Sequence, residues 1–453
     1  MLATATAPTI RNLIVDYYDV ISAAVDRCGA GPGGPAGTPQ FAPGFNLPEL
    51  SPDVRQFFAA ATASWRELGT HSGHRLQLMD LTGNPGTHTT KTFPSLLIVA
   101  RAVEHIRRTG EAICIFTPTS ANKGIALRDA VARAIAAKLV TPEQLSVVVL
   151  APGSTKHKFR CDPLSSDSAL RARNPLLRFA GAEPEGVKAL GRAFVDAYAG
   201  EAYEKHGTAL WFSLALPNYL VADAARAAFE AEVAPPTMLR WHAHAVSSAF
   251  GLLGYNLGRD VLEAAGRVDP AQRPGFLLVQ HLGTPDMVLN LRHGSFSREH
   301  LPEYRMDAAG SWTQDTDPHF PLVTDDPEEV LDPTFYTHQP VTSPAMNDLI
   351  ARFGGDGIAV SRRECVARYP MLRQLFHNTP RQLPADPADL REWSLVMALT
   401  GVLNAIDRGL VPADREIVVH GSGSYAGDDY TISEPDAEVS TVDEIAAVVL
   451  GGR

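Results

Sequence analysis

Two polar segments of the chain carry the side chains best suited to chemistry, residues 84–91 and residues 119–124. The first reads Asn-Pro-Gly-Thr-His-Thr-Thr-Lys and ends in Lys91, directly before a helical pattern that Gly110 ends. A lysine held in a cleft away from water loses its proton readily and can form a Schiff base with a carbonyl group. Two interpretations of Lys91 therefore stay open at this point, a nucleophile and a solvated surface charge.

The second segment, Thr119-Ser-Ala-Asn-Lys-Gly124, follows the apolar run 112–116 and opens another helical pattern. The N–H groups and the positive dipole end of a helix N-terminus favour a carboxylate or another anion. Ser and Asn are also preferred helix caps, so Ser120 and Asn122 could serve as simple caps. Capping and substrate binding are compatible, and both interpretations stay open.

Together the two segments resemble motifs of the pyridoxal-phosphate enzymes of fold type II, which include tryptophan synthase β, cysteine synthase and threonine synthase. There an Asn-Pro-x-Gly-Ser-Phe-Lys segment supplies the Schiff-base lysine, and a Ser-Gly-Asn-x-Gly loop about thirty residues later grips the substrate carboxylate and the cofactor's ring oxygen. Here Lys91 and Ser120 are 120 − 91 = 29 positions apart. The chain has one extra residue between Asn84 and Lys91, Thr90 in place of Phe, and Ala121 in place of Gly.

The resemblance implies a role for each matching residue. Lys91 would be the catalytic lysine and would hold pyridoxal 5'-phosphate together with Asn122. The substrate would meet residues of both segments, namely His88, Thr90, Thr119, Ser120, Ala121 and Lys123. Lys123 stands where the family has a small hydroxyl residue, and a cation there would suit a substrate with a second acidic group or a phosphate leaving group.

A third segment falls where the family has its glycine-rich phosphate loop, Gly-x-Gly-Gly-Thr. It contains two serines and no glycine, although glycine lets backbone N–H groups approach a phosphate closely. We predict that the cofactor phosphate binds His244, Ala245, Val246, Ser247 and Ser248. The alternative is that His242 and His244 are ordinary core or surface histidines.

A fourth segment, Gly421-Ser-Gly-Ser-Tyr425, follows the last strong strand pattern, residues 416–420. It resembles the family's Thr/Ser-Gly-x-Gly-x-Lys-Asp turn, where a hydroxyl group hydrogen-bonds the pyridine nitrogen of the cofactor. The resemblance implies that Ser422 has this role, with His420 as the positional alternative.

Between these motifs, apolar runs typical of buried strands alternate with helical patterns, which indicates a parallel α/β sheet. The resemblance implies two open parallel-sheet domains of the tryptophan synthase β type with the cofactor in the cleft between them. We expect a large cofactor domain from residues 71–91 and 205–453 and a small substrate domain from residues 92–204. Residues 1–70 would form a helical extension, with helices over 10–27 and 52–68 and a Gly/Pro-rich linker from Gly29 to Pro48.

Composition excludes several classes of protein. The chain has 453 residues, 45% hydrophobic and 20% charged, which is typical of a soluble protein with room for two domains. A net charge of −11 argues against a nucleic-acid partner. Apolar runs are too short for a membrane span, and the N-terminus does not read as a signal peptide, so we expect a cytoplasmic protein. Four scattered cysteines suggest neither disulfides nor a metal site, and Asp315 and Asp317 lack the glycine turn of a calcium loop.

We therefore expect a pyridoxal-phosphate enzyme acting on an amino acid with an activated side chain. It would perform β-elimination or β-replacement through an aminoacrylate intermediate, and the Ala/Gly/Pro/Arg-rich composition hints at specialised metabolism. Threonine-synthase-like β,γ chemistry is the close alternative. The alternative from another functional class is a non-catalytic relative that has kept the fold as a binding protein. A further alternative is an unrelated α/β enzyme whose motif matches are accidental. A homodimer is expected from the family alone.

Overall fold

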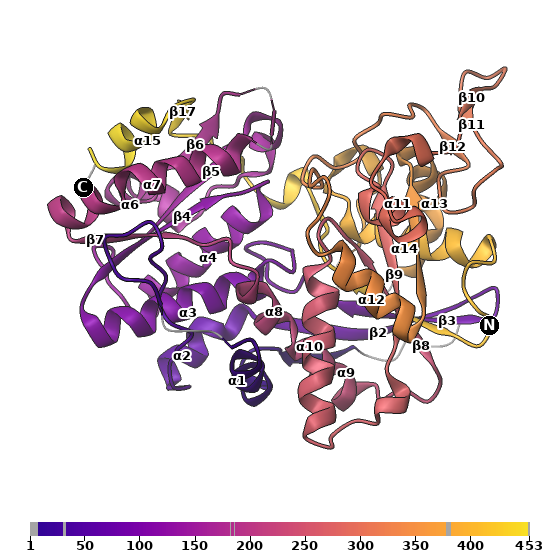
Figure 1. The fold of residues 1–453 in the computed structure, drawn as a ribbon, viewed down its shortest axis with the longest axis horizontal. Helices are drawn as coiled ribbons and strands as arrows, with labels where there is room; N and C mark the ends of the chain where they lie inside the picture. The colour runs from indigo at the N-terminus through magenta and orange to yellow at the C-terminus, as the bar shows by residue number, and fades with distance from the viewer. Residues whose placement is uncertain (1–7, 30–32, 182, 185, 377–381, 452–453) are drawn as a thin grey trace. The chain divides into compact units, whose positions relative to one another are not determined.

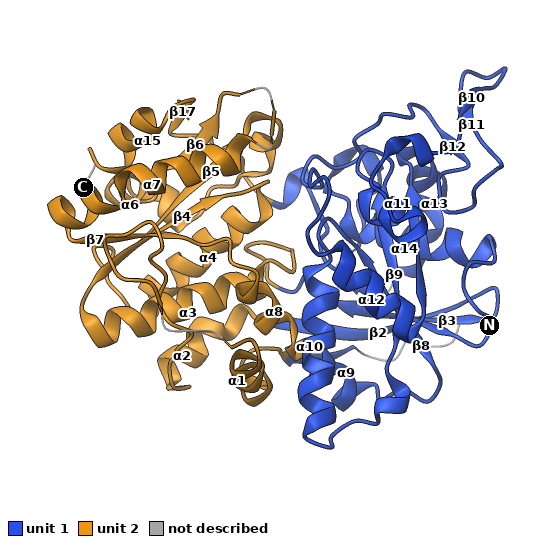
Figure 2. Ribbon diagram, in the orientation of Figure 1, with its two compact units in different colours: residues 1–11, 62–83, 226–429 blue, residues 12–61, 84–225, 430–453 orange. Residues whose placement is uncertain are grey.

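The computed structural model describes residues 8–29, 33–181, 183–184, 186–376 and 382–451. The chain divides into two compact units (Figure 1, Figure 2). Unit 1 contains residues 1–11, 62–83 and 226–429, and unit 2 contains residues 12–61, 84–225 and 430–453. The predicted N-terminal extension and linker include residues 1–7 and 30–32, which lie outside the described residues.

Unit 1 is built on a seven-stranded sheet in which β2 runs antiparallel to β3 and the strands from β3 to β13 are parallel. The order across the sheet is β1 (Thr9–Asn12), β2 (Thr62–His71), β3 (His74–Asp80), β15 (Glu416–Gly421), β8 (Arg240–Ala245), β9 (Gly275–His281) and β13 (Gly355–Val360). In β8, Trp241, Ala243 and Ala245 belong to the apolar core shared with helix α14 (Ser394–Asp407). Side chains alternate along a strand, so His242 and His244 lie on the opposite face.

The other helices of unit 1 are α9 (Ala225–Val233), α10 (Phe250–Ala264), α11 (Asp286–His293), α12 (Ser343–Phe353) and α13 (Arg362–Leu375). Short strands extend from its loops: β10 (Arg305–Met306), β11 (Trp312–Thr313) and β12 (Val323–Thr324) form one small antiparallel sheet, and β14 (Leu390–Glu392) pairs with β16 (Tyr425–Ala426). The long polar stretch 292–345 is therefore partly ordered by its own strands. Within the described residues, no group of His, Cys, Asp or Glu has the geometry of a metal site.

Unit 2 is built on a five-stranded parallel sheet. Its order is β17 (Ala437–Val439), β6 (Leu176–Phe179), β5 (Leu145–Pro152), β4 (Ala112–Pro118) and β7 (Thr208–Phe212). Every residue of β5 is buried, as expected for a strand covered on both faces. The helices are α1 (Tyr18–Arg27), α2 (Pro52–Phe57), α3 (Thr92–Thr109), α4 (Asn122–Ala136), α5 (Pro163–Ser166), α6 (Ser168–Arg173), α7 (Gly186–His206), α8 (Pro217–Asp223) and α15 (Val442–Val449).

The predicted fold class is confirmed, because each unit is organised around a sheet of parallel strands. The helix predicted over 52–68 is wrong beyond Phe57, since residues 62–71 form β2. Pairing with β3 supplies the backbone hydrogen bonds of this segment, and that long-range contact outweighs its helix-like apolar spacing. The segment 9–12 likewise forms β1, so the first helix starts at Tyr18. No helix among the described residues has the length and apolarity to cross a bilayer.

The division into units assigns three segments differently from the predicted domains. Strand β7 pairs with β4, and β17 pairs with β6, so both segments belong to the sheet of unit 2. The loop that carries Lys91 also belongs to unit 2.

Candidate active site

Lys91 lies at the N-terminus of α3, at the end of a loop that Asn84 holds in place. The Asn84 side chain is 1% exposed and donates to Thr92 Oγ1 at 3.1 Å and to Asp129 Oδ2 at 2.8 Å. Asp129 belongs to α4, so the lysine loop is tied to the helix that follows the second motif. Lys91 is half-buried, and its Nζ lies 5.7 Å from the centre of the Tyr219 ring on α8.

The second motif forms a tight turn at the N-terminus of α4. The Thr119 hydroxyl accepts hydrogen bonds from the N–H groups of Ala121 at 3.2 Å and Gly124 at 3.3 Å. Ala121 has φ +137° and ψ −62°, a backbone conformation that residues other than glycine rarely adopt. A Cβ atom on Gly124 would lie 2.7 Å from Val149 Cγ1, so only glycine fits there. The turn is therefore strained and closely packed where the resemblance predicts carboxylate binding.

Lys123, on the first turn of α4, is only 6% exposed. Its Nζ donates to the Ser213 carbonyl oxygen at 2.6 Å and to Ser213 Oγ at 3.0 Å, and lies 5.6 Å from the centre of the Tyr219 ring. Burial lowers the pKa of Lys123 well below its usual value, and the charge of Lys91 lowers that pKa further. A neutral amine at Lys123 would not attract an acidic group by charge, but it can accept a proton.

Sequence reasoning missed Ser213 and Tyr219. Ser213 follows β7, and Tyr219 lies in the first turn of α8. Both come about a hundred residues after the motifs that they contact. The order of strands in the unit 2 sheet brings them together, because β7 pairs directly with β4. His88, with φ +52°, and Thr90, 7% exposed, lie in the same loop as Lys91.

In unit 1 the structure brings the third and fourth motifs together at the carboxyl ends of two neighbouring strands, β8 and β15. His420 is fully buried, with its Nδ1 3.1 Å from Arg226 Nη1 and its Nε2 2.8 Å from His242 Nδ1. A guanidinium group can only donate, so Nδ1 of His420 accepts and Nε2 donates to His242. Burial lowers the pKa of His420 well below its usual value, as do the charges around it.

Both ring nitrogens of His420 are thus engaged by protein groups, which leaves Ser422 as the better candidate for the pyridine nitrogen. Ser422 is 6% exposed and directly follows β15. His242 continues the chain of contacts, since its Nε2 lies 3.3 Å from Glu230 Oε1.

The segment predicted to bind the phosphate forms the connection from β8 to α10. Ala245 and Val246 are buried, while Ser247 and Ser248 are half-buried. The Val246 N–H donates to the Val279 carbonyl oxygen at 2.8 Å, and the Ser248 carbonyl oxygen accepts from Thr342 Oγ1 at 2.7 Å. These hydrogen bonds hold the connection in place just before the N-terminus of α10.

Just beyond this segment, two buried side chains pack so closely against Gly251 that no larger residue fits there. A Cβ atom there would lie 2.5 Å from Arg226 Nη1 and 2.9 Å from His244 Nε2. Arg226 is 1% exposed and His244 is 7% exposed. Glycine at this position therefore lets the Arg226 guanidinium group and the His244 imidazole pack directly against the first turn of α10.

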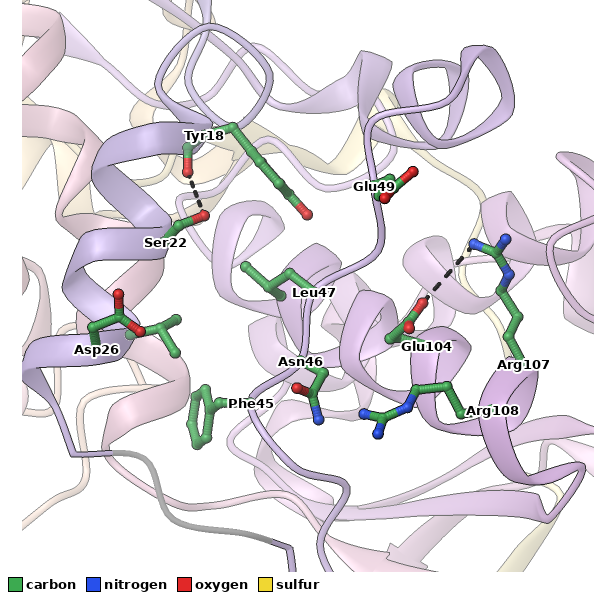
Figure 3. A pocket seen from close by; sticks show the side chains of 11 residues that line it. Tyr18, Ser22, Asp26, Phe45, Asn46, Leu47, Glu49, Glu104, Arg107 and Arg108 are labelled. Atoms are coloured by element: carbon green, nitrogen blue, oxygen red, sulfur yellow. Dashed lines mark hydrogen bonds and ion pairs between the residues drawn. The ribbon is translucent and has the colours of Figure 1, made fainter.

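A separate pocket of about 620 Å³ lies in unit 2 between α1, residues 45–49 and α3. Figure 3 shows that Glu104 and Arg107 face one another on its wall, where their charged groups are 3.9 Å apart. Tyr18 contributes its hydroxyl group, which donates to the Pro48 carbonyl oxygen at 2.5 Å. None of the residues predicted to do chemistry lines this pocket.

The chain belongs to DUF6002, a family of unknown function, whose model matches residues 9–452. A comparison with curated protein sequences found no match.

Among solved structures, the chain is similar to threonine synthase from Escherichia coli, with 14% sequence identity and a TM-score of 0.53 over 84% of this chain and 79% of that chain. It is also similar to a PLP-bound threonine synthase from Brucella melitensis, with 12% identity and a TM-score of 0.50 over 83% of this chain and 78% of that chain. The fold is therefore that of the fold-type II enzymes, which confirms the resemblance inferred from the motifs.

Proposed function

We propose that this protein is a pyridoxal-phosphate enzyme, a lyase or synthase that eliminates or replaces a substituent on the β carbon of an amino acid. The observation that carries the proposal is the arrangement in unit 2. There a half-buried lysine at the start of α3 is tied through Asn84 and Asp129 to α4, the helix that the strained turn at Ala121 opens. The threonine synthase fold supports it, because that turn and that lysine match the family's motifs in order and spacing.

Bound pyridoxal phosphate would supply the electron sink that stabilises negative charge at the substrate's α carbon. Lys91 would hold the cofactor and, once the substrate amine has displaced it, accept the α proton at Nζ. The N–H groups at the start of α4, around Ser120 and Asn122, would bind the substrate carboxylate. Ser422 would donate a hydrogen bond to the pyridine nitrogen.

The surroundings of Lys91 include a second amine. Lys91 and Lys123 lie over the same ring, Tyr219. Burial lowers the pKa of Lys123, and the charge of Lys91 lowers that pKa further. A neutral Lys123 beside Lys91 would be able to accept a proton during the proposed chemistry.

Chemistry at the γ carbon is the second candidate, since the two solved structures described above are threonine synthases. A non-catalytic binding protein is the third. Offering O-acetylserine and O-phosphohomoserine as substrates separates these possibilities. Release of acetate from the first supports β chemistry, release of phosphate from the second supports β,γ chemistry, and turnover of neither supports a binding role.

The test of the cofactor is the visible absorption spectrum of the purified protein with added pyridoxal phosphate. We expect an absorption band that borohydride bleaches, with the reduced adduct located on Lys91 by peptide mass spectrometry. Lys91→Ala should abolish the adduct, whereas the exposed control Lys205→Ala should keep it. A wild-type protein that stays colourless and forms no adduct would refute the proposal.

A further inference from the structure

We propose that Arg101 is a positioning residue for Lys123, and that residues 43–45 hold Arg101 in the orientation that this role requires. The inference rests on the proposed function, because Lys123 would accept a proton in that reaction. Arg101 lies on α3 and reaches the surroundings of Lys123 through the first turn of α8. Residues 43–45 belong to the 33–48 segment before α2, so this segment gains a part in the candidate active site.

Arg101 is a buried arginine whose hydrogen bonds go to neutral oxygen atoms. It is 3% exposed, and its Nε donates to the Gly44 carbonyl oxygen at 3.3 Å, while its Nη2 donates to the Pro43 carbonyl oxygen. Its Nη1 donates to Oδ1 of Asn218 on α8. Within the part of the chain that the structure describes, Arg101 forms no ion pair. Burying a guanidinium group without a carboxylate costs free energy, so its use here points to its rigid fork of donors, which joins three acceptors at once.

Two aromatic rings also contact the guanidinium group. Its Cζ lies 3.5 Å from the centre of the Phe45 ring and 5.0 Å from the centre of the Trp211 ring on β7. A guanidinium group stacks on aromatic faces, which restricts its orientation. Residues 43–45 therefore supply two carbonyl acceptors and one ring, and they determine where the third donor of Arg101 points.

Asn218 connects Arg101 to the groups that surround the Lys123 amine. Its Nδ2 lies 3.5 Å from the Ser213 carbonyl oxygen, the same atom that accepts from Lys123 Nζ at 2.6 Å. Tyr219, whose ring centre lies 5.6 Å from Lys123 Nζ, is the next residue of α8. The N-cap residue of α8 forms no capping bond with its side chain, so the bond from Arg101 is an anchor for this first turn.

This anchoring should be visible in the protonation of Lys123. Burial lowers the pKa of Lys123, and the charge of Lys91 lowers that pKa further. When Ser213 and Tyr219 are no longer held against the amine, water can reach it, and burial then lowers its pKa less. Loss of Arg101 should therefore move the pKa of Lys123 back towards its usual value.

The test is a pH titration of the protein without cofactor, followed by NMR of lysine labelled with carbon-13 at Cε. In each background, the Lys123 signal is the one that Lys123→Arg removes. Wild-type Lys123 should titrate at lower pH than the exposed Lys205. In Arg101→Met the midpoint should rise towards that of Lys205. Arg101→Lys should raise it too, because an ammonium group keeps the charge but cannot join all three acceptors. Both variants should also lower kcat at pH 7 about tenfold with KM little changed.

Arg192→Met is the matched control. Arg192 also donates to a carbonyl oxygen of the 33–48 segment, that of Pro39 at 2.7 Å, and its Cζ lies 4.9 Å from the centre of a ring on β7, Phe212. Its other hydrogen bonds go to Asp196 on its own helix. Arg192→Met should therefore loosen the same segment and leave the Lys123 midpoint at its wild-type value.

An unchanged Lys123 midpoint in Arg101→Met, folded by circular dichroism, would overturn the proposal. A wild-type midpoint in Arg101→Lys would also overturn it, because the charge alone would then be sufficient. An equal rise in Arg192→Met would do the same, since any loosening of the 33–48 segment would then have the effect. Should Arg101→Met fail to fold, Arg101→Lys decides alone. The titration needs no cofactor, so the proposed function stands or falls separately, by the borohydride adduct on Lys91.

Discussion

Replacing Ala121 by glycine tests whether the turn before α4 is strained. Ala121 is fully buried and has φ +137°, a region that glycine enters without steric cost. Most alanine-to-glycine changes destabilise a protein, because glycine gains conformational freedom in the unfolded chain. At Ala121 the relief of strain opposes that loss of stability. The change to glycine should therefore leave the stability unchanged or increase it.

The expected magnitude follows from three contributions to the free energy of unfolding. Relief of backbone strain contributes about 1–3 kcal/mol of stability. The added freedom of the unfolded chain removes about 0.4–1 kcal/mol. Loss of one buried methyl group removes about 0.8 kcal/mol. With central values, Ala121→Gly should be more stable than the wild type by about 0.5 kcal/mol.

Ala130, fully buried inside α4, provides the control. Ala130→Gly has no strain to relieve, and it should lose about 1 kcal/mol of helix propensity and about 0.8 kcal/mol of methyl burial. Urea denaturation of the two variants without cofactor measures the difference, which should be about 2 kcal/mol in favour of Ala121→Gly. If both variants lose equal stability, the turn is not strained and the argument from its conformation fails.

Three further changes test the electrostatics and anchoring of each unit. Lys123→Met should raise the melting temperature near pH 7 relative to wild type, because the lowered pKa of Lys123 means that the wild type must release a proton when it folds. The gain in melting temperature should shrink as the pH rises towards 10. A gain that is constant with pH would contradict this. Asn84→Ala should cost about 2–3 kcal/mol in urea denaturation, since it removes a buried side chain that bonds Thr92 and Asp129; a loss near zero would show that the loop is held by other contacts. Burial raises the pKa of Glu329 to about 7, so Glu329→Gln should be more stable than wild type at pH 8 and lose that advantage towards pH 4, as thermal unfolding at the two pH values would show.

The fold was predictable because local signals and long-range packing agree over most of the chain. The residues of β5, Leu145–Pro152, form a nearly continuous apolar run, as expected for a strand that is covered on both faces. Gly110 ends α3 in a left-handed conformation, as its place after the helical pattern indicated. The segment 62–71 is the exception, since its strand conformation depends on pairing with β3, and a spacing of apolar residues cannot reveal a partner strand.

Within the candidate site, the sequence indicated the residues that lie inside contiguous motifs and missed those that topology brings to them. Lys91, Thr119 and Lys123 were found because motif order and spacing are local properties. Tyr219 and Arg226 carry no motif of their own. Each reaches its place because a strand, β7 or β8, lies next to another that is distant in sequence.

The burial of Lys123 bears on what the enzyme would recognise. A cation that recruits an acidic substrate must keep its charge, and an amine keeps its charge only where water or carboxylates compensate it. Lys123 instead donates to one carbonyl oxygen and one hydroxyl group of Ser213, both neutral, in a buried environment. The change from a small hydroxyl residue to lysine at this position is therefore better explained by proton transfer beside Lys91 than by a second acidic group on the substrate. It follows that Lys123 is a poor candidate for selecting an acidic substrate side chain by charge.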